Sequence, residues 1–212
     1  QLRERLGSTA HHPRWALAWK FPSETAETVV MDINWATGRT GAITPVAHVA
    51  PQFVGGVTVE RVTLHNLGEI ERLGIQIGDR VKLTRRGDVI PKIIEILGPA
   101  LPEDLVGRKY SDGSLFEENL PVRQKPSIPF NCPDCRTAVN NDGTFIRCPN
   151  LMCLARLSRQ IQYWCRSLEI DGVGEKLIYQ MINSKLVTQI SDLYDLDIKK
   201  LVKLERVGKK SY

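Results

Sequence analysis

Two pairs of closely spaced cysteines carry the strongest chemical signal in the sequence. Two residues separate Cys132 from Cys135, four separate Cys148 from Cys153, and 12 residues lie between the pairs. A C-x2-C turn brings two sulfurs to one ion, and a second pair completes the four ligands of a tetrahedral zinc site. Because all four positions are cysteine, no coordination position stays open for a substrate. We therefore expect a structural zinc ion, which replaces a hydrophobic core that so short a segment cannot build.

Two disulfides, four free thiols or a rubredoxin-like iron site are the alternatives for these cysteines. The first ten residues are polar and charged, with no apolar segment of a secretory signal after them. We therefore expect a cytoplasmic protein, and a reducing compartment favours a metal over disulfides. The fifth cysteine, Cys165, falls on the apolar positions of a predicted helix, where we expect a small buried hydrophobic side chain.

A glycine-containing turn between two helical segments is the second candidate site. Gly172 and Gly174 lie in the segment Ile170–Lys176, directly before the second helical segment. Glycines let the backbone turn sharply, and the free N–H groups of a helix N-terminus bind phosphate, here next to Lys176. The pattern predicts a helix-hairpin-helix unit that contacts the DNA backbone without reading sequence. A plain helix cap with a tight turn is the alternative.

A second hairpin of this kind is predicted near the end of the sequence. Gly208 in the segment Leu204–Lys210 matches the second glycine, whereas Arg206 stands where the first would be. Before both hairpins, apolar residues recur at helical spacing over residues 155–168. An all-α segment is therefore expected to follow the cysteines.

The elements before the cysteines are predicted to be strands. Residues 24–35 alternate, with Val29, Met31, Ile33 and Trp35 on one face and Val30, Asp32 and Asn34 on the other. A Gly-rich turn at 38–41 leads to a second strand over 42–50, which Pro45 should make an edge or bulged strand. Further strands are expected over 57–64, 80–84 and 89–97.

A short helix is predicted between the third and fourth strands. Asn66 and Glu69 fit an N-terminal capping box, and Gly74 fits the helix end. Five strands with one short helix in this position are typical of an OB-fold barrel.

Composition and charge agree with a soluble, DNA-binding protein. The chain has 212 residues, 42% hydrophobic and 25% charged, and a net charge of +5. Residues 106–212 contain 17 basic and 12 acidic groups, so the second half is the basic part and suits a polyanion. No apolar run reaches the length of a membrane helix. The sequence begins without Met and ends among helix-like residues, so we expect a segment of a longer protein.

The motifs occur in the same order as in bacterial NAD-dependent DNA ligases, which the chain resembles along nearly its whole length. Ala18–Pro22 resembles the last nucleotidyltransferase motif, at the end of the adenylation domain, and Gly38–Ala47 resembles the main signature of the OB domain. The other matching motifs are Val62–Asn66, Ile77–Asp79, Gly87–Pro91, the four cysteines and Asp171–Gly174.

The resemblance implies an enzyme that transfers AMP from NAD to a lysine, then to a 5′-phosphate at a nick, which the 3′-hydroxyl finally attacks. Lys20 matches the family lysine at the nucleotide phosphate, where it would be both a catalytic and a cofactor-binding residue. Arg14 is a weaker candidate near the same motif. Residues matching DNA contacts of the barrel are Arg39, Thr40, Arg85, Val89 and Ile90. NAD and Mg²⁺ would serve the whole enzyme, in replication and repair.

The sequence departs from the family in lacking the Lys-x-Asp-Gly motif of the adenylated nucleophile. We therefore expect this chain to bind nicked duplex DNA as a monomer, without sequence preference, but not to ligate alone. The alternative is a stand-alone OB and zinc-finger adaptor for nucleic acids. The expected multidomain order is the end of the adenylation domain (1–22), the all-β OB-fold barrel (23–100), a connector (101–131), the small four-cysteine zinc finger (132–154) and the incomplete, all-α helix-hairpin-helix domain (155–212).

Overall fold

The computed structural model describes residues 2–9, 12–17, 23–86 and 90–205 of the chain. Three residues with predicted roles, Lys20, Val89 and Gly208, lie outside the described residues. Within the described part, no helix combines the length and apolarity that a membrane crossing requires.

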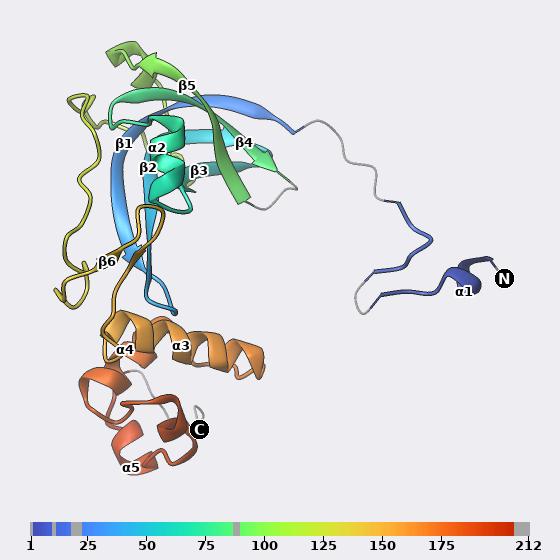
Figure 1. Cartoon of the computed structure of the whole chain (residues 1–212), viewed down its shortest axis with the longest axis vertical. Helices are drawn as coiled ribbons and strands as arrows, with labels where there is room; N and C mark the ends of the chain where they lie inside the picture. The colour runs from blue at the N-terminus through green and yellow to red at the C-terminus, as the bar shows by residue number, and fades with distance from the viewer. Residues whose placement is uncertain (1, 10–11, 18–22, 87–89, 206–212) are drawn as a thin grey trace.

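A curled antiparallel sheet forms the larger part of the molecule (Figure 1). Its five main strands are β1 (Thr25–Thr37), β2 (Ala42–Val54), β3 (Val57–Thr63), β4 (Asp79–Arg86) and β5 (Ile90–Pro99). The first half of β1 pairs with β4 and its second half with β2, so this one long strand belongs to both sides of the barrel. β3 and β5 contact each other across the remaining side. The predicted OB-fold barrel is confirmed.

A β-bulge in β1 changes which residues enter the barrel core. The pairing of β1 with β2 shifts register between Val30 and Asp32. Val30 and Ile33 therefore both point into the main core, whereas Val29 and Met31 pack on the other face. The predicted strand is present, but its predicted face is wrong in part, because a bulge resets the two-residue alternation.

Pro45 was predicted to lie in an edge or bulged strand; the edge is wrong, whereas β2 is bulged, because its pairing with β3 shifts register between His48 and Gln52. β2 pairs with β1 on one side and β3 on the other. The carbonyl of Pro45 accepts a hydrogen bond from the N–H of Leu64, just beyond the point where the ladder with β3 ends at Val46 and Thr63. The ring nitrogen faces the same side, so its missing N–H removes no bond within that ladder.

The helix α2 (Leu67–Leu73) covers one end of the barrel and begins and ends as predicted. Asn66 Oδ1 accepts a hydrogen bond from the Glu69 N–H at 2.9 Å, and Gly74 ends the helix in the left-handed conformation, with φ of 64°. Only half of the expected capping box forms, because the Glu69 carboxylate bonds Arg72 at 2.7 Å instead of reaching back. Leu67 and Ile70 are the residues that α2 buries.

Residues 101–131 follow the barrel closely, although they contain only the short 3-10 helix η1 (Pro102–Leu105). Arg108 donates to Gln52 at 2.7 Å and to the Glu27 carbonyl at 3.2 Å. Farther along, Arg123 forms an ion pair with the fully buried Asp79 at 2.7 Å between Nε and Oδ1. The segment thus covers the outer face of β1, where Leu105 and Phe116 pack with Val29.

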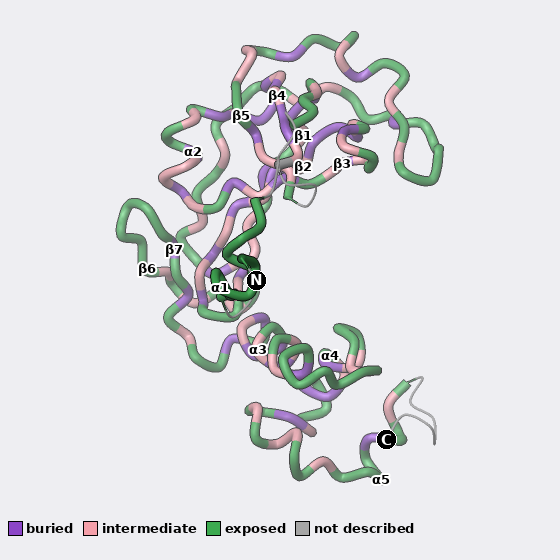
Figure 2. Tube along the Cα trace, turned by 90° about the vertical axis from the view of Figure 1, so that its right-hand side faces the viewer, coloured by how far each residue is buried: buried purple, intermediate pink, exposed green. Residues whose placement is uncertain are grey.

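The third part of the molecule is helical. It contains α3 (Leu154–Ser167), α4 (Glu175–Asn183), the 3-10 helix η2 (Ile190–Tyr194) and α5 (Ile198–Leu201). These elements share their own core, separate from that of the barrel, around Ile161, Ile178 and Met181 (Figure 2). Cys165 is buried in this core, as its place in the sequence predicts. Between barrel and helices lie the cysteines and the short strands β6 (Asn140–Asn141) and β7 (Ile146–Arg147).

Candidate metal centre and nucleic-acid interface

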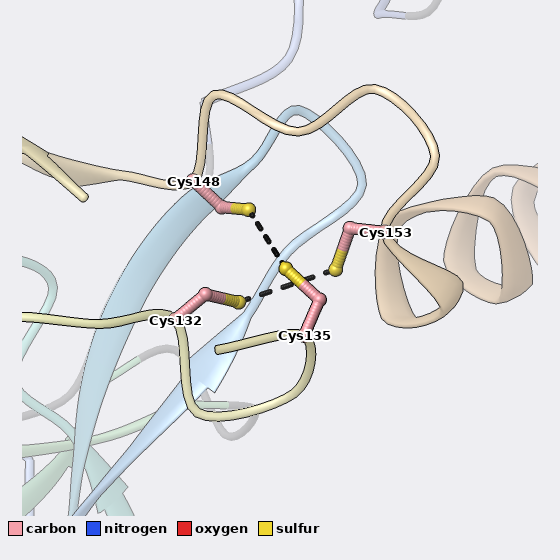
Figure 3. A group of neighbouring side chains, drawn as sticks. All are labelled: Cys132, Cys135, Cys148 and Cys153. Carbon is pink, nitrogen blue, oxygen red and sulfur yellow. Dashed lines mark hydrogen bonds between the residues drawn. The ribbon is translucent and has the colours of Figure 1, made fainter. Parts of the chain in front are cut away.

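The four predicted ligands come together in one cluster (Figure 3). Their sulfurs all lie within 4.8 Å of one another, with 4.0 Å between Cys132 and Cys153 and 3.5 Å between Cys135 and Cys148. Sulfurs about 2.3 Å from a tetrahedral zinc ion are roughly 3.8 Å apart, so the cluster has the size of a four-thiolate zinc site. Neither pair is at the bonding distance of a disulfide, about 2.05 Å.

Burial and hydrogen bonding act in opposite directions on the acidity of these thiols. Burial raises the pKa of Cys148 to about 12 and also raises that of Cys153. At Cys135 burial is outweighed by hydrogen bonds with Thr137, which lower the pKa to about 6. Metal ligation requires thiolates, so an ion entering this cluster must displace protons, and acid must weaken its binding.

Two threonine hydroxyls surround the cluster. The Thr137 hydroxyl lies 3.3 Å from the sulfur of Cys135, and the Thr37 hydroxyl lies 3.3 Å from that of Cys132. Such outer partners orient ligands and tune metal affinity. The role of Thr137 could have been predicted from the sequence, because it lies two residues after the predicted ligand Cys135. Thr37 belongs to β1, 95 residues from Cys132, and nothing in its local sequence indicates this role.

The cysteine cluster is joined directly to the barrel. β7 pairs with the start of β2, through Ala42 with Arg147 and Ile43 with Ile146. The Cys148 N–H also donates to the Gly41 carbonyl at 2.8 Å. A Cβ added at Gly41 would lie 2.7 Å from the Cys148 carbonyl oxygen, so only glycine fits there. The turn between β1 and β2 is therefore held in close contact with Cys148, one of the predicted metal ligands.

Arg39 and Thr40 lie exposed in that turn, as a role in binding requires. The guanidinium carbon of Arg39 lies 3.6 Å from the ring centroid of Tyr163 on α3. The Arg39 carbonyl accepts a hydrogen bond from Gln160 Nε2 at 3.1 Å. Neither α3 residue was singled out from the sequence, because a cation over a ring joins positions far apart in the chain.

The other predicted barrel residues that the structure describes, Arg85 and Ile90, lie toward the opposite end of the sheet. Arg85 donates through Nη1 to the Gly55 carbonyl, which ties β4 to the turn between β2 and β3. Ile90, at the start of β5, is 58% exposed, and other large apolar side chains of the barrel strands, such as Phe53 and Ile94, are exposed as well. The structure thus places Ile90 at the surface and Arg85 in a structural contact, apart from Arg39 and Thr40.

The turn before α4 has the geometry that its glycines predict. Gly172 adopts a left-handed φ of 81°, and Gly174 is the N-cap of α4 with no side-chain cap of its own. Lys176 is exposed in the first turn of the helix. Gly174 therefore provides no side chain to cap the first backbone N–H groups of α4. These groups lie in the same helical turn as the exposed Lys176.

Comparison with known proteins identifies relatives over the whole chain. Residues 27–104 match the family model of the NAD-dependent DNA ligase OB-fold domain. A DNA ligase of Saccharophagus degradans is 44% identical over 99% of this chain, and one of Solibacter usitatus is 44% identical over 100% of it. A DNA ligase of Halorubrum lacusprofundi is 42% identical over 99% of the chain. The chain spans 29%, 30% and 27% of the lengths of these relatives, respectively.

Proposed function

Because this chain belongs to the NAD-dependent DNA ligase family, we propose that it is the DNA-binding part of an enzyme that seals nicks in duplex DNA during replication and repair. The chain would bind the duplex as a monomer, in the cytoplasm, without reading its sequence. Catalysis would need a Lys-x-Asp-Gly nucleophile, which its 212 residues lack. NAD and Mg²⁺ would therefore be used by the whole enzyme, with Lys20 at the nucleotide phosphate.

The observation that carries this proposal is similarity that spans the barrel, the cysteines and the helices. The contacts support it physically. Arg39 and Thr40 would grip the DNA backbone from the turn between β1 and β2, while Ile90 and its neighbour Val89 would enter the minor groove. Apolar side chains exposed at the edge of a barrel are suited to that groove.

The helical part would act as a second contact to the backbone. We propose that α3, the turn with Gly172 and Gly174, and α4 form a helix-hairpin-helix unit, in which the α4 N-terminus and Lys176 bind a phosphate. Gly208 would serve a second such unit. The four cysteines would hold a structural zinc ion that fixes the barrel relative to these helices.

Binding of the chain to a nicked duplex, followed across a salt series, tests the proposal. Each phosphate neutralised should contribute about −0.9 to the slope of log K against log salt, so binding should weaken steeply with salt. Shuffling the duplex sequence should not change the affinity. A folded, zinc-loaded chain that ignores nicked duplexes at low salt would contradict the proposed function.

Arg39→Ala and Lys109→Ala provide a matched pair of variants, because each removes one exposed positive charge. Lys109 lies on the segment next to Arg108, which bonds the far end of β2 from Arg39. Arg39→Ala should weaken binding about tenfold, a typical value for one well-placed arginine contact, and Lys109→Ala should change it little.

Mixing the wild-type chain with the separately made adenylation domain of a relative should produce nick closure.

A further inference from the structure

The helix α3 contacts both the side chain and the backbone of Arg39, a residue of the barrel. Tyr163 of α3 lies under the Arg39 guanidinium at 3.6 Å, and Gln160, one helical turn earlier, donates to the Arg39 carbonyl at 3.1 Å. Residues three apart share a helix face, so one face of α3 makes both contacts. Tyr163 is 52% exposed, and its ring therefore contributes little to the helical core.

The stack leaves most of the hydrogen-bonding groups of Arg39 available. A guanidinium over a ring uses its flat face, while its five N–H donors point outward in the plane. An exposed arginine otherwise samples many rotamers, and ordering one on binding reduces affinity. A hydrogen bond with Ser167, a hydrogen bond with Arg39 and the charge of Arg39 lower the pKa of Tyr163, in agreement with the stacking contact between the two side chains.

We propose that Tyr163 is a positioning residue for DNA binding, whose ring holds the Arg39 guanidinium ready to contact the backbone of the nicked duplex. This inference rests on the proposed function and adds a residue to it. α3 then serves the barrel, in addition to its place in the helical unit. Tyr163 itself need not touch the DNA, because it acts through Arg39.

A double-mutant cycle on the full chain, titrated with nicked duplex at low salt, tests the inference. Tyr163→Ala should weaken binding about 3- to 10-fold, whereas Tyr163→Phe, which keeps the ring, should stay within about twofold of wild type. In the Arg39→Ala background, Tyr163→Ala should have no further effect. Tyr163→Leu, which keeps volume without an aromatic face, should behave like Tyr163→Ala.

Tyr179→Ala is the matched control, because Tyr179 is a 40% exposed tyrosine on the neighbouring helix α4. It should leave DNA affinity unchanged. Thermal unfolding and bound zinc of every variant show whether the fold persists. In variants whose fold persists, the phenol of Tyr163 supplies a second readout of its contact with Arg39. Its pKa should rise toward that of free tyrosine in Arg39→Ala, as followed by ultraviolet titration or NMR.

The outcomes separate this inference from the proposed function. If wild-type chain binds nicked DNA and Tyr163→Ala binds equally well, the positioning role is overturned and the proposed function stands. Additive losses in the double variant, or no loss in Arg39→Ala, also overturn the role. If the wild-type chain does not bind, both ideas fail together.

Discussion

Glu69 balances two cations at the start of α2. Its carboxylate lies 2.7 Å from Arg72 Nε and 3.7 Å from Lys92 Nζ, and its side chain is 16% exposed. The hydrogen bond from Arg72 is the main cause that lowers its pKa to about 2. Because the folded pKa is below the ordinary value, the charged form stabilises the fold above pH 4.5, and this stabilisation disappears as pH falls toward 2.

Replacing Glu69 by glutamine should therefore destabilise the protein in a pH-dependent way. We expect a loss of about 0.5 kcal/mol at neutral pH, as for a screened surface pair, shrinking as pH falls from about 5 toward 2. Urea unfolding followed by tryptophan fluorescence measures the difference. Glu71→Gln, an exposed glutamate on the same helix, is the control and should show a smaller difference. An undiminished Glu69→Gln difference near pH 3 would rule out this role for the charge.

Among single residues, the sequence predicted the four cysteines of the candidate metal site, but not the residues that contact Cys132 and Arg39. The four cysteines are recognisable because each pair is local in the chain and its spacing alone permits a shared ion. Thr37 and Tyr163 are ordinary residues in a strand and a helix, and only folding brings them to Cys132 and Arg39. Long-range contacts of this kind leave no periodic signal in one sequence.

The turn between β1 and β2 is the element on which barrel, cysteine cluster and α3 meet. Gly41 there adopts a φ of 86°, and its added Cβ would lie 2.7 Å from the Cys148 carbonyl oxygen and 3.1 Å from Arg156 Cζ. Arg156 in turn donates to the carbonyls of Cys148 and Asn150, both at 3.2 Å. A side chain at Gly41 must therefore push the second cysteine pair away from the turn.

Comparing Gly41→Ala with Gly56→Ala separates this close approach from backbone strain. Gly56 has a similar φ of 81°, but nothing lies within 4 Å of its added Cβ. Gly56→Ala should cost about 1 kcal/mol for the left-handed conformation, and Gly41→Ala about 2 kcal/mol more for overpacking. Denaturant unfolding gives both values, and zinc affinity should fall in Gly41→Ala only. Equal effects of the two substitutions would contradict the close approach.

Elements were predictable where local chemistry decides them. Asn66 and Gly74 bound α2 as their residue types require, and the alternating segments became the five barrel strands. The bulge after Val30 was not predicted, because Val29, Val30 and Met31 are all apolar and this run does not indicate which of them faces the core. Of the two alternatives predicted from Pro45, only the edge strand is wrong, since the tolerance of Pro45 in β2 depends on where the pairing with β3 ends.

Among the described residues, three of the four buried clusters follow one another from the barrel to the helices. The barrel core around Val81 and Leu83 and the helical core around Ile161 are separate, and the cluster that includes the cysteines, Ile43 and Ile146 lies between them. We therefore expect the barrel to keep its own core without a metal ion. The cluster around the cysteines, which connects the barrel to the helices, should then change.

Removing the proposed zinc ion with a strong chelator should loosen that connection selectively. Hydrogen exchange should accelerate at the Cys148 amide, which bonds Gly41, and in the pairing of β7 with β2, but not in β4. Affinity for nicked DNA should fall about tenfold, because Arg39 and the α4 N-terminus lose their common support. Zinc should restore both properties. Unfolding of the barrel on chelation, or unaltered exchange near Cys148, would refute this division.

The contacts of Thr37 with Cys132 and of Gly41 with Cys148 also limit how this protein can be recombined with its relatives. A chimera that takes residues 132–153 from one of the DNA ligase relatives would place foreign cysteine turns against the native strands β1 and β2. The contacts of Thr37 and Gly41 with these turns would then no longer be matched. The natural unit of exchange thus includes residues 37–43 as well, a discontinuous block that a graft of the cysteine segment alone does not transfer.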